Sequence, residues 1–361
     1  MKRLCLLLLV LPMLTGCSFV TLERQIYPIC MSVDVSQDGW MVGVQAPRAE
    51  AGGNASYEIL SAAGDTFDHA LRTLSASTPY PLHFGQIRLC LIGYPLAVKT
   101  EMRGLLRTLL ELPSMRPDCY VSIALGSAMD VMQYQKPDFG MRLSTHLSLL
   151  LDRMQKEHLL PDSTLSACVR EMSDGRSDML IGVSAVNRRL LPEEKKSAPG
   201  SGGNEEPSAP AAALGEPWSD ALLPPDIMAG LIPHTSQNPV EYLGAAALSG
   251  HRVSGILTAD QVQLALRLKE EAKMRVLREG ERLCLQINLP KDSTLLQNTD
   301  AIVGLMETLQ ALGSDPLLFG CICSMGFAAD AAWERYDFRS RYPQAEVVVS
   351  VSGRFIEKNV K

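Results

Sequence analysis

The spacing of apolar residues predicts both helices and strands along this chain. Three segments repeat apolar side chains at positions i, i+3, i+4 and i+7, the pattern of a helix with one buried face. The helices they predict cover about residues 67–74, 96–111 and 300–312. Short, mostly apolar runs at 87–92 and 120–125 indicate buried strands. These elements alternate without the strict β–α–β order of a doubly wound sheet, so we expect an α+β fold with several packed helices.

Alternating patterns and turn residues predict paired strands elsewhere. Residues 282–289 place four apolar side chains on one face and polar ones on the other, which indicates a half-buried strand. Turn chemistry divides residues 26–44 into two strands, and Gly250-His251 divides residues 244–257 in the same way. A valine-rich run at 345–356 predicts a closing strand.

One segment in the middle of the chain has the composition of a linker. Residues 197–217 contain no aromatic and no β-branched residue, and proline-rich sequence continues to about Pro239. Such a segment buries too little apolar surface to offset the entropy lost on ordering. We therefore expect a disordered Pro/Gly/Ser/Ala-rich linker over residues 191–240. It would join two domains with mixed or antiparallel sheets, an N-terminal one at 17–190 and a C-terminal one at 241–361.

The first residues of the chain have the features of a secretory signal. Lys2 and Arg3 precede an apolar run from Leu4 to Leu14, which is too short to cross a bilayer that needs about 20 helical residues. The run ends in Leu14-Thr15-Gly16-Cys17, which resembles a bacterial lipobox. We expect a signal peptide over residues 1–16 and lipidation of Cys17, which would hold the folded part at the extracytoplasmic face of a membrane. A plain signal peptide cut elsewhere is the alternative.

Charge and cysteine content narrow the classes of partner. The net charge is −6, and removal of Lys2 and Arg3 from the 34 basic residues leaves 32 against 40 acidic ones, a net charge of −8. An acidic chain with no basic cluster argues against nucleic acid and against electrostatic binding to anionic lipid. Beyond Cys17 the chain has an odd number of scattered cysteines, which does not indicate a disulfide framework. They are Cys30, Cys90, Cys119, Cys168, Cys284, Cys321 and Cys323.

No candidate catalytic, cofactor or metal site emerges from the motifs. Cys321 and Cys323 are spaced too closely for a usual zinc site and have no partner pair, so buried thiols in a strand or turn are expected. His83 lacks a nucleophile-elbow serine and is expected to be a turn or core residue. Asp34 and Asp38 flank a turn without the carboxylate density of a calcium loop. The glycines at 200–203 lack the context of a phosphate loop.

Several blocks, in order behind the lipobox, resemble one family. The C subunits of spore germinant receptors, the GerC or GerAC lipoproteins, are similar to this chain over most of its length after Cys17. The similar blocks are Glu23–Ile26, Tyr57–Leu71, His83–Gly93, Gly244–Leu248, Gly255–Thr258, Gln310–Gly320 and Val347–Val351. Between Leu257 and Asp315 the chain is several strands shorter than is usual in the family.

The resemblance implies a function without catalysis. It implies a lipid-anchored, non-enzymatic subunit that acts in nutrient-triggered germination, with two integral membrane partners, the A and B subunits, at the outer face of the spore inner membrane. No cofactor and no metal are implied. Two other classes remain open from the residues alone. A lipoprotein solute-binding module would need a ligand cleft between two lobes, and an anchored envelope hydrolase would need a catalytic site.

Overall fold

A computed structural model describes residues 24–36, 39–48, 56–137, 140–186, 239–279 and 282–351 of the 361. The expected signal peptide at 1–16, the lipidation candidate Cys17 and nearly all of the expected linker at 191–240 lie outside these residues. Within the described residues, no helix is both long enough and apolar enough to cross a membrane.

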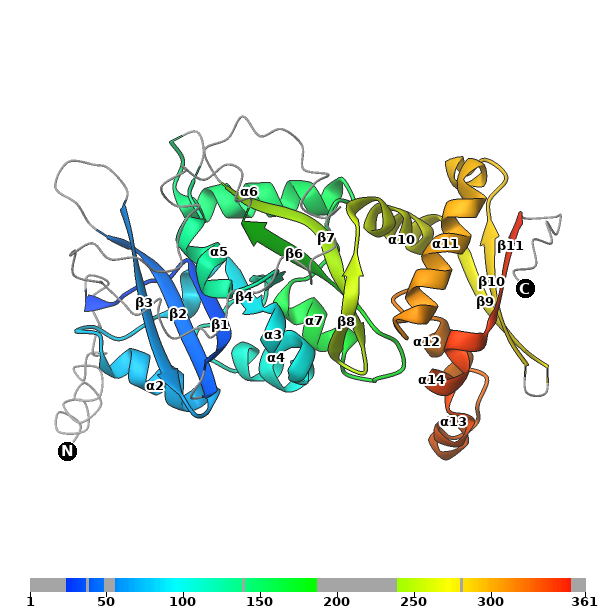
Figure 1. The fold of residues 1–361 in the computed structure, drawn as a ribbon, viewed down its shortest axis with the longest axis horizontal. Helices are drawn as coiled ribbons and strands as arrows, with labels where there is room; N and C mark the ends of the chain where they lie inside the picture. The colour runs from blue at the N-terminus through cyan, green and yellow to red at the C-terminus, as the bar shows by residue number, and fades with distance from the viewer. Residues whose placement is uncertain are drawn as a thin grey trace, which may run out of the picture.

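An eight-stranded sheet forms the larger part of the molecule (Figure 1), with strands in the order β3-β2-β1-β4-β5-β6-β7-β8. The central strands β1, β4, β5 and β6 run parallel to one another, and each end of the sheet is completed by an antiparallel pair. The strands are β1 (Cys30–Ser36), β2 (Gly39–Arg48), β3 (Ser56–Gly64), β4 (Leu89–Gly93), β5 (Tyr120–Ala124), β6 (Leu180–Val186), β7 (Val240–Ser249) and β8 (Arg252–Leu257).

Helices cover both faces of this sheet. One face packs on α2 (Phe67–Ala76), α3 (Tyr94–Lys99), α4 (Met102–Leu110) and α7 (Leu165–Glu171). The other face packs on α5 (Ala128–Tyr134) and α6 (Leu143–Lys156). The side chains that predicted α2, from Phe67 to Leu74, are all buried in the first of these cores, because their spacing keeps them on one side of the helix.

A smaller three-stranded sheet follows toward the C-terminus, in the order β11-β10-β9. Its strands are β9 (Lys273–Glu279), β10 (Arg282–Leu289) and β11 (Glu346–Val351). One face is covered by helices, and α10 links this sheet to β8. The helices of this part are α10 (Ala259–Glu271), α11 (Thr299–Ala311), α12 (Phe319–Ser324), α13 (Asp330–Tyr336) and α14 (Phe338–Arg341). The α+β class expected from the sequence, with mixed sheets and packed helices, is therefore confirmed.

The expected start of the second domain at residue 241 does not match the sheet. Strand β7 pairs with β6 along its length, from Val240 opposite Val186 to Ala247 opposite Leu180, and β8 pairs with β7. Both strands after the expected linker therefore complete the N-terminal sheet. The linker composition is real, but residues 187–238 connect two neighbouring strands of one sheet, and not two domains. Pairing between residues this far apart leaves no local signal in the sequence.

Three local expectations are also corrected. The helix expected over 96–111 is divided into α3 and α4, since Thr100 and Glu101 have extended backbones and the N–H of Met102 donates to the carbonyl of His251 (2.8 Å). Cys321 and Cys323 lie in helix α12 instead of a strand or turn. Strand β11 runs parallel to β10, whereas only antiparallel strands were expected in this part.

The pairing of β6 with β7 predicts the outcome of limited proteolysis. Exposed segments of small and polar residues are preferred cleavage sites, so the first cuts should fall between residues 197 and 239. A denaturing gel should show two fragments, whereas size-exclusion chromatography should show one particle of unchanged size, because the two fragments share a sheet. Separation of the fragments in native buffer would contradict this pairing; unfolding in urea should separate them.

Candidate functional site

The candidate site is the junction between the two sheets, where buried polar groups and close backbone contacts join the two parts of the described structure. Strand β7 contributes to two cores at once, because its alternate side chains point to opposite faces. Ala246 and Leu248 belong to the core on the face of the sheet that α2, α3, α4 and α7 cover, whereas Ala245 and Ala247 belong to the core that includes α10, α11 and β10. The second hydrophobic core is thereby continuous with the large sheet, and the two parts of the molecule form one packed body.

Two glycines allow the close approach of the two parts. A Cβ atom on Gly320 at the start of α12 would lie 1.9 Å from the carbonyl oxygen of Arg176, which precedes β6. A Cβ on Gly255 in β8 would lie 2.4 Å from a methyl carbon of Leu312, which follows α11. The contact at Gly320 is with rigid backbone, so only a residue without a side chain fits there, whereas at Gly255 the end of the Leu312 side chain would have to shift.

Asp178 is a buried carboxylate in the loop before β6, and it is bonded from three directions. Its Oδ1 accepts from Arg339 Nη2 (2.9 Å) and from the N–H of Gly250 in the β7–β8 turn (3.2 Å). Its Oδ2 accepts from Arg339 Nη1 (3.3 Å) and from the N–H of Asp315 (3.1 Å). The side chain therefore joins the loop before β6 to three other segments, which include helix α14.

Asp315 is the second buried carboxylate of the junction. Its two oxygens accept from the N–H groups of Phe319 (3.1 Å) and Gly320 (2.6 Å), and its own carbonyl accepts from the N–H of Asp178 (3.0 Å). Burial raises the pKa of Asp315 to about 7, and the negative charge of Asp178 adds to this effect. The two backbone donors and the Arg339 guanidinium oppose the rise.

Ion pairs at the rim of the junction connect the same two parts. Arg176 Nη2 lies 2.9 Å from Asp330 Oδ1 on α13. On the other side, His158 Nε2 lies 3.0 Å from Glu270 Oε1 on α10. The side chains of these pairs are partly exposed, so each pair contributes little to the free energy of unfolding.

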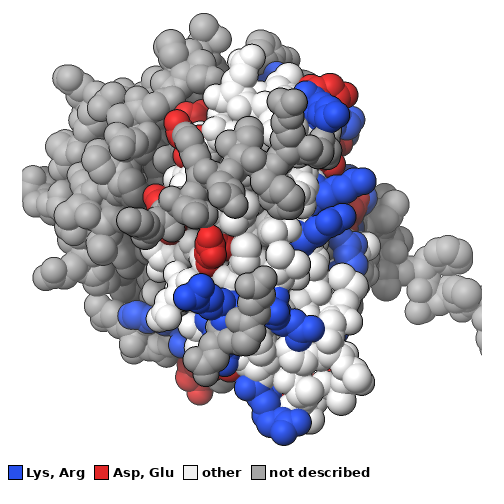
Figure 2. Space-filling model, turned by 90° about the vertical axis from the view of Figure 1, so that its right-hand side faces the viewer, with Lys and Arg blue, Asp and Glu red and all other residues white. Residues whose placement is uncertain are grey.

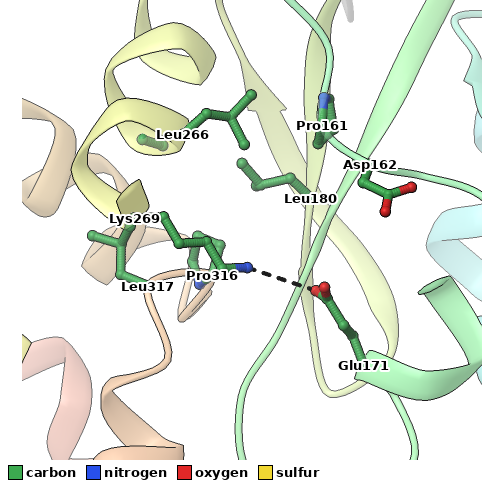
Figure 3. Close-up of a pocket in the computed structure, with 9 residues that line it drawn as sticks. Pro161, Asp162, Glu171, Leu180, Leu266, Lys269, Pro316 and Leu317 are labelled. Carbon is green, nitrogen blue, oxygen red and sulfur yellow. Dashed lines mark ion pairs between the residues drawn. The ribbon is translucent and has the colours of Figure 1, made fainter. Parts of the chain in front are cut away.

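A small cavity of about 150 Å³ lies at this junction (Figure 3). Glu171 of α7 and Lys269 of α10 face each other across it, with 3.8 Å between Oε2 and Nζ. Its other walls are mainly apolar: Pro161, Asp162, Leu180, Ala265, Leu266, Pro316 and Leu317. Ligand pockets usually enclose about 300–1,000 Å³, so this cavity is a packing gap between α10 and the sheet and not a substrate site.

The residues weighed from the sequence are not brought together by the fold. His83 Nδ1 accepts from the N–H of Gly85 (3.3 Å) and caps a short helical turn, as expected for a turn residue. Cys323 is buried in α12, and Cys321 is partly exposed there. Among the described residues there is no group of three or more His, Cys, Asp or Glu side chains that could hold a metal ion.

Asp34, weighed above only as a calcium ligand, has a structural role. It is buried at the edge of β1, and its carboxylate accepts from the N–H groups of Ala128 (2.8 Å) and Met129 (2.9 Å) and from Ser127 Oγ (3.1 Å). Burial raises its pKa to about 6 against these hydrogen bonds. It thus fixes the start of α5 on the sheet. The carboxylates of Asp34, Asp178 and Asp315 thus each accept hydrogen bonds from backbone groups that hold the fold together.

The sequence reasoning missed Asp178, Asp315 and Arg339. They are far apart in the chain, and each belongs to a segment without a recognisable motif. The one local signal is Asp315 itself, which precedes the Pro316–Phe319 turn by a spacing that allows it to cap the start of α12.

Comparison with known proteins gives a match to one family model. Residues 19–185 match the family described as "Spore germination protein N-terminal domain". This range contains most of the large sheet, from β1 to nearly the end of β6.

Two individual proteins are similar to this chain. The "Spore germination protein GerQC" of Bacillus cereus is 25% identical over 195 residues, which are 53% of this chain and 53% of that protein. The chain thus matches about half the length of this curated relative. A solved structure, "Crystal Structure of the GerBC protein", aligns with 12% identity and a TM-score of 0.43, over 89% of this chain and 95% of that one.

The pair Asp178–Arg339 predicts a large effect of one substitution. Arg339→Ala would leave the buried Asp178 carboxylate without a cation and should lower the free energy of unfolding by about 2–3 kcal/mol. Arg107→Ala is the matched control, because Arg107 pairs at 3.0 Å with Glu111 on the surface of α4. It should cost less than about 1 kcal/mol. Equal effects in chemical denaturation would show that Asp178 does not depend on Arg339.

The raised pKa of Asp315 predicts how stability changes with pH. The folded chain holds a proton on Asp315 up to pH about 7, whereas an unfolded aspartate releases it near pH 3.9. The free energy of unfolding should therefore fall as pH rises from about 4 to about 7. Asp34 adds a fall that ends near its own pKa of about 6. In Asp315→Asn, urea titrations should show a smaller fall between pH 4 and 6 and almost none between pH 6 and 7; an unchanged pH profile would contradict the assignment.

Proposed function

We propose that this chain is the lipid-anchored, non-enzymatic C subunit of a spore germinant receptor, because its residues 19–185 match the family described as "Spore germination protein N-terminal domain". The resemblance to these subunits, which the sequence indicated, is confirmed by the family match and by the curated relative. A role in spore germination follows at this coarse level. The match over 19–185 is the observation that carries the finer proposal, since it covers β1 to nearly the end of β6 in the large sheet.

The partners in this proposal are the two integral membrane subunits, A and B, of the same receptor. The chain would be held beside them at the outer face of the spore inner membrane by lipid at Cys17. Tethering confines both partners to one plane, which raises their effective concentration and allows a modest interface to suffice. The Leu-Thr-Gly-Cys sequence at 14–17, after an apolar run too short to span the bilayer, supports the anchor.

The architecture also favours a docking subunit over the two alternatives. A solute-binding module needs two lobes that close on a ligand, whereas here the second core is continuous with the large sheet through β7. The described cavity between them is about 150 Å³. An envelope hydrolase needs a nucleophile or metal with a positioned base, and the described polar groups of the junction are engaged in holding segments together. Neither alternative gains a specific observation in its favour.

The anchor is tested by a single substitution. Cys17→Ala should abolish metabolic labelling with a fatty acid and move the protein from the membrane fraction to the soluble fraction of spores. Cys5→Ala is the matched control, because Cys5 lies in the same N-terminal segment but within the apolar run; it should leave labelling unchanged. Persistent labelling of the Cys17→Ala protein would exclude this anchor.

The receptor role is tested in spores that lack the native copy. The Cys17→Ala protein should give little germinant-triggered loss of optical density, although it accumulates to the normal level. The response should return when the same domain is anchored by an unrelated lipobox. A full response without any membrane-bound protein would refute a tethered subunit. A response that fails to return on re-anchoring would assign a specific role to the native N-terminal segment.

A further inference from the structure

Strand β9 is a free edge of the three-stranded sheet. Among the described residues it pairs with β10 alone, with Asn288 opposite Lys273 at one end and Arg282 opposite Glu279 at the other. Its outer side therefore presents backbone N–H and C=O groups that another extended segment could pair with. Natural sheets usually cover or shorten such edges, and this one is seven residues long.

Two of the five exposed large apolar side chains in the described structure lie at this edge. Leu277, in the middle of β9, is 43% exposed, and Met325, at the end of α12, is 72% exposed. They are neighbours of the same arginine, because Arg278 follows Leu277 and donates to the carbonyl of Gly326 (3.0 Å), which follows Met325. Leu277 alternates with Met274 and Val276, which pack on the helix-covered core, so it points to the open face of the sheet. Met325, in contrast, lies on the helix side. A strand added at this edge would carry side chains on both faces and could contact both residues.

The edge is also positively charged. Lys273 and Arg275 are exposed on the open face of β9, and no ion pair in the described residues involves them. Figure 2 shows Lys and Arg side chains gathered on this end of the molecule. Arg282 extends the same charge on β10. The charge is local, since the whole chain has a net charge of −6.

Arg278 is a cation held in a fixed place. Its guanidinium carbon lies 4.2 Å from the ring centroid of Phe327, and one of its nitrogens is bonded to the Gly326 carbonyl. A Cβ on Gly326 would lie 2.5 Å from that guanidinium, so glycine at this position leaves room for the Arg278 side chain. Arginine fixed in this way loses little entropy when it binds a carboxylate.

We propose that β9 is the docking edge for an extended, acidic segment of a membrane subunit of the receptor. The segment pairs with the free backbone groups of β9, its carboxylates meet Lys273, Arg275 and Arg278, and its apolar side chains contact Leu277 and Met325. This proposal rests on the proposed receptor function. A strand is favoured over lipid headgroups as the occupant, because the free edge offers a row of backbone donors and acceptors together with the charge.

The test places a photo-reactive residue at the edge of the intact protein. The full chain is co-expressed and co-purified with its two membrane subunits, with p-benzoylphenylalanine in place of Leu277. Leu149 on α6 is the matched control position, because it is also a leucine and is 58% exposed. Irradiation should join position 277, and not position 149, to a membrane subunit, and mass spectrometry should locate the bond in a segment of net negative charge.

A charge-reversal substitution gives a second test of the proposed docking edge. Arg275→Glu should lower the cross-linked yield about tenfold, because like charges then face each other across the interface. Arg103→Glu, which reverses an exposed arginine on α4, should leave the yield unchanged. Circular dichroism and the thermal midpoint of each variant establish that it is folded.

The other outcomes each overturn the proposal. Products with lipid alone would make β9 a membrane-contact strand, and products with a second copy of this chain would make it a dimer interface. A chain that co-purifies with the membrane subunits without a product from position 277 docks elsewhere. A wild-type chain that fails to co-purify with them contradicts the receptor function itself, and the edge proposal falls with it.

Discussion

The structure depends above all on the antiparallel pairing of β6 with β7. This pairing joins residues separated by the whole 187–238 segment, and it places β7 between the two main cores. Alternate side chains of β7 then pack in opposite directions, with Ala246 in one core and Ala247 in the other. Closing such a long connection costs conformational entropy, although that cost grows only slowly with length. The apolar area buried on both faces of β7 offsets it.

The polar junction beside β7 follows from the same arrangement. Two carboxylates are buried there, and burial alone would disfavour both. Asp178 is compensated by Arg339, whereas Asp315 is compensated mainly by the backbone N–H groups of Phe319 and Gly320. Such a network contributes less to total stability than apolar packing of the same volume would. The network fixes how the two parts are oriented, since its hydrogen bonds form together in one relative position of the two parts. The close contact of Gly320 with the Arg176 carbonyl restricts that position further.

Sequence periodicity predicted the elements whose burial is decided locally. The apolar stripes of α2 and α11 and the alternation in β10 appear in the structure as expected, because side-chain spacing alone assigns their buried faces. It could not predict that β7 returns to the first sheet or that β11 lies parallel to β10, because both depend on distant partners. The junction was hidden for the same reason. Asp178, Asp315 and Arg339 read separately as ordinary loop and helix residues, and only the fold brings them together.

A body of this kind constrains how a receptor subunit can act. Periplasmic binding modules respond to ligands by closing around a hinge, but here β7 and the Asp178 network join both parts without a separate hinge. The two described parts are therefore expected to move together, without closing on each other around a hinge. The free edge of β9 is carried by the part farthest along the chain from Cys17, while the family match covers the part nearest to it. In the proposed receptor, the lipid at Cys17 and the edge of β9 would be two attachment points of one chain, so each would raise the effective concentration for binding at the other.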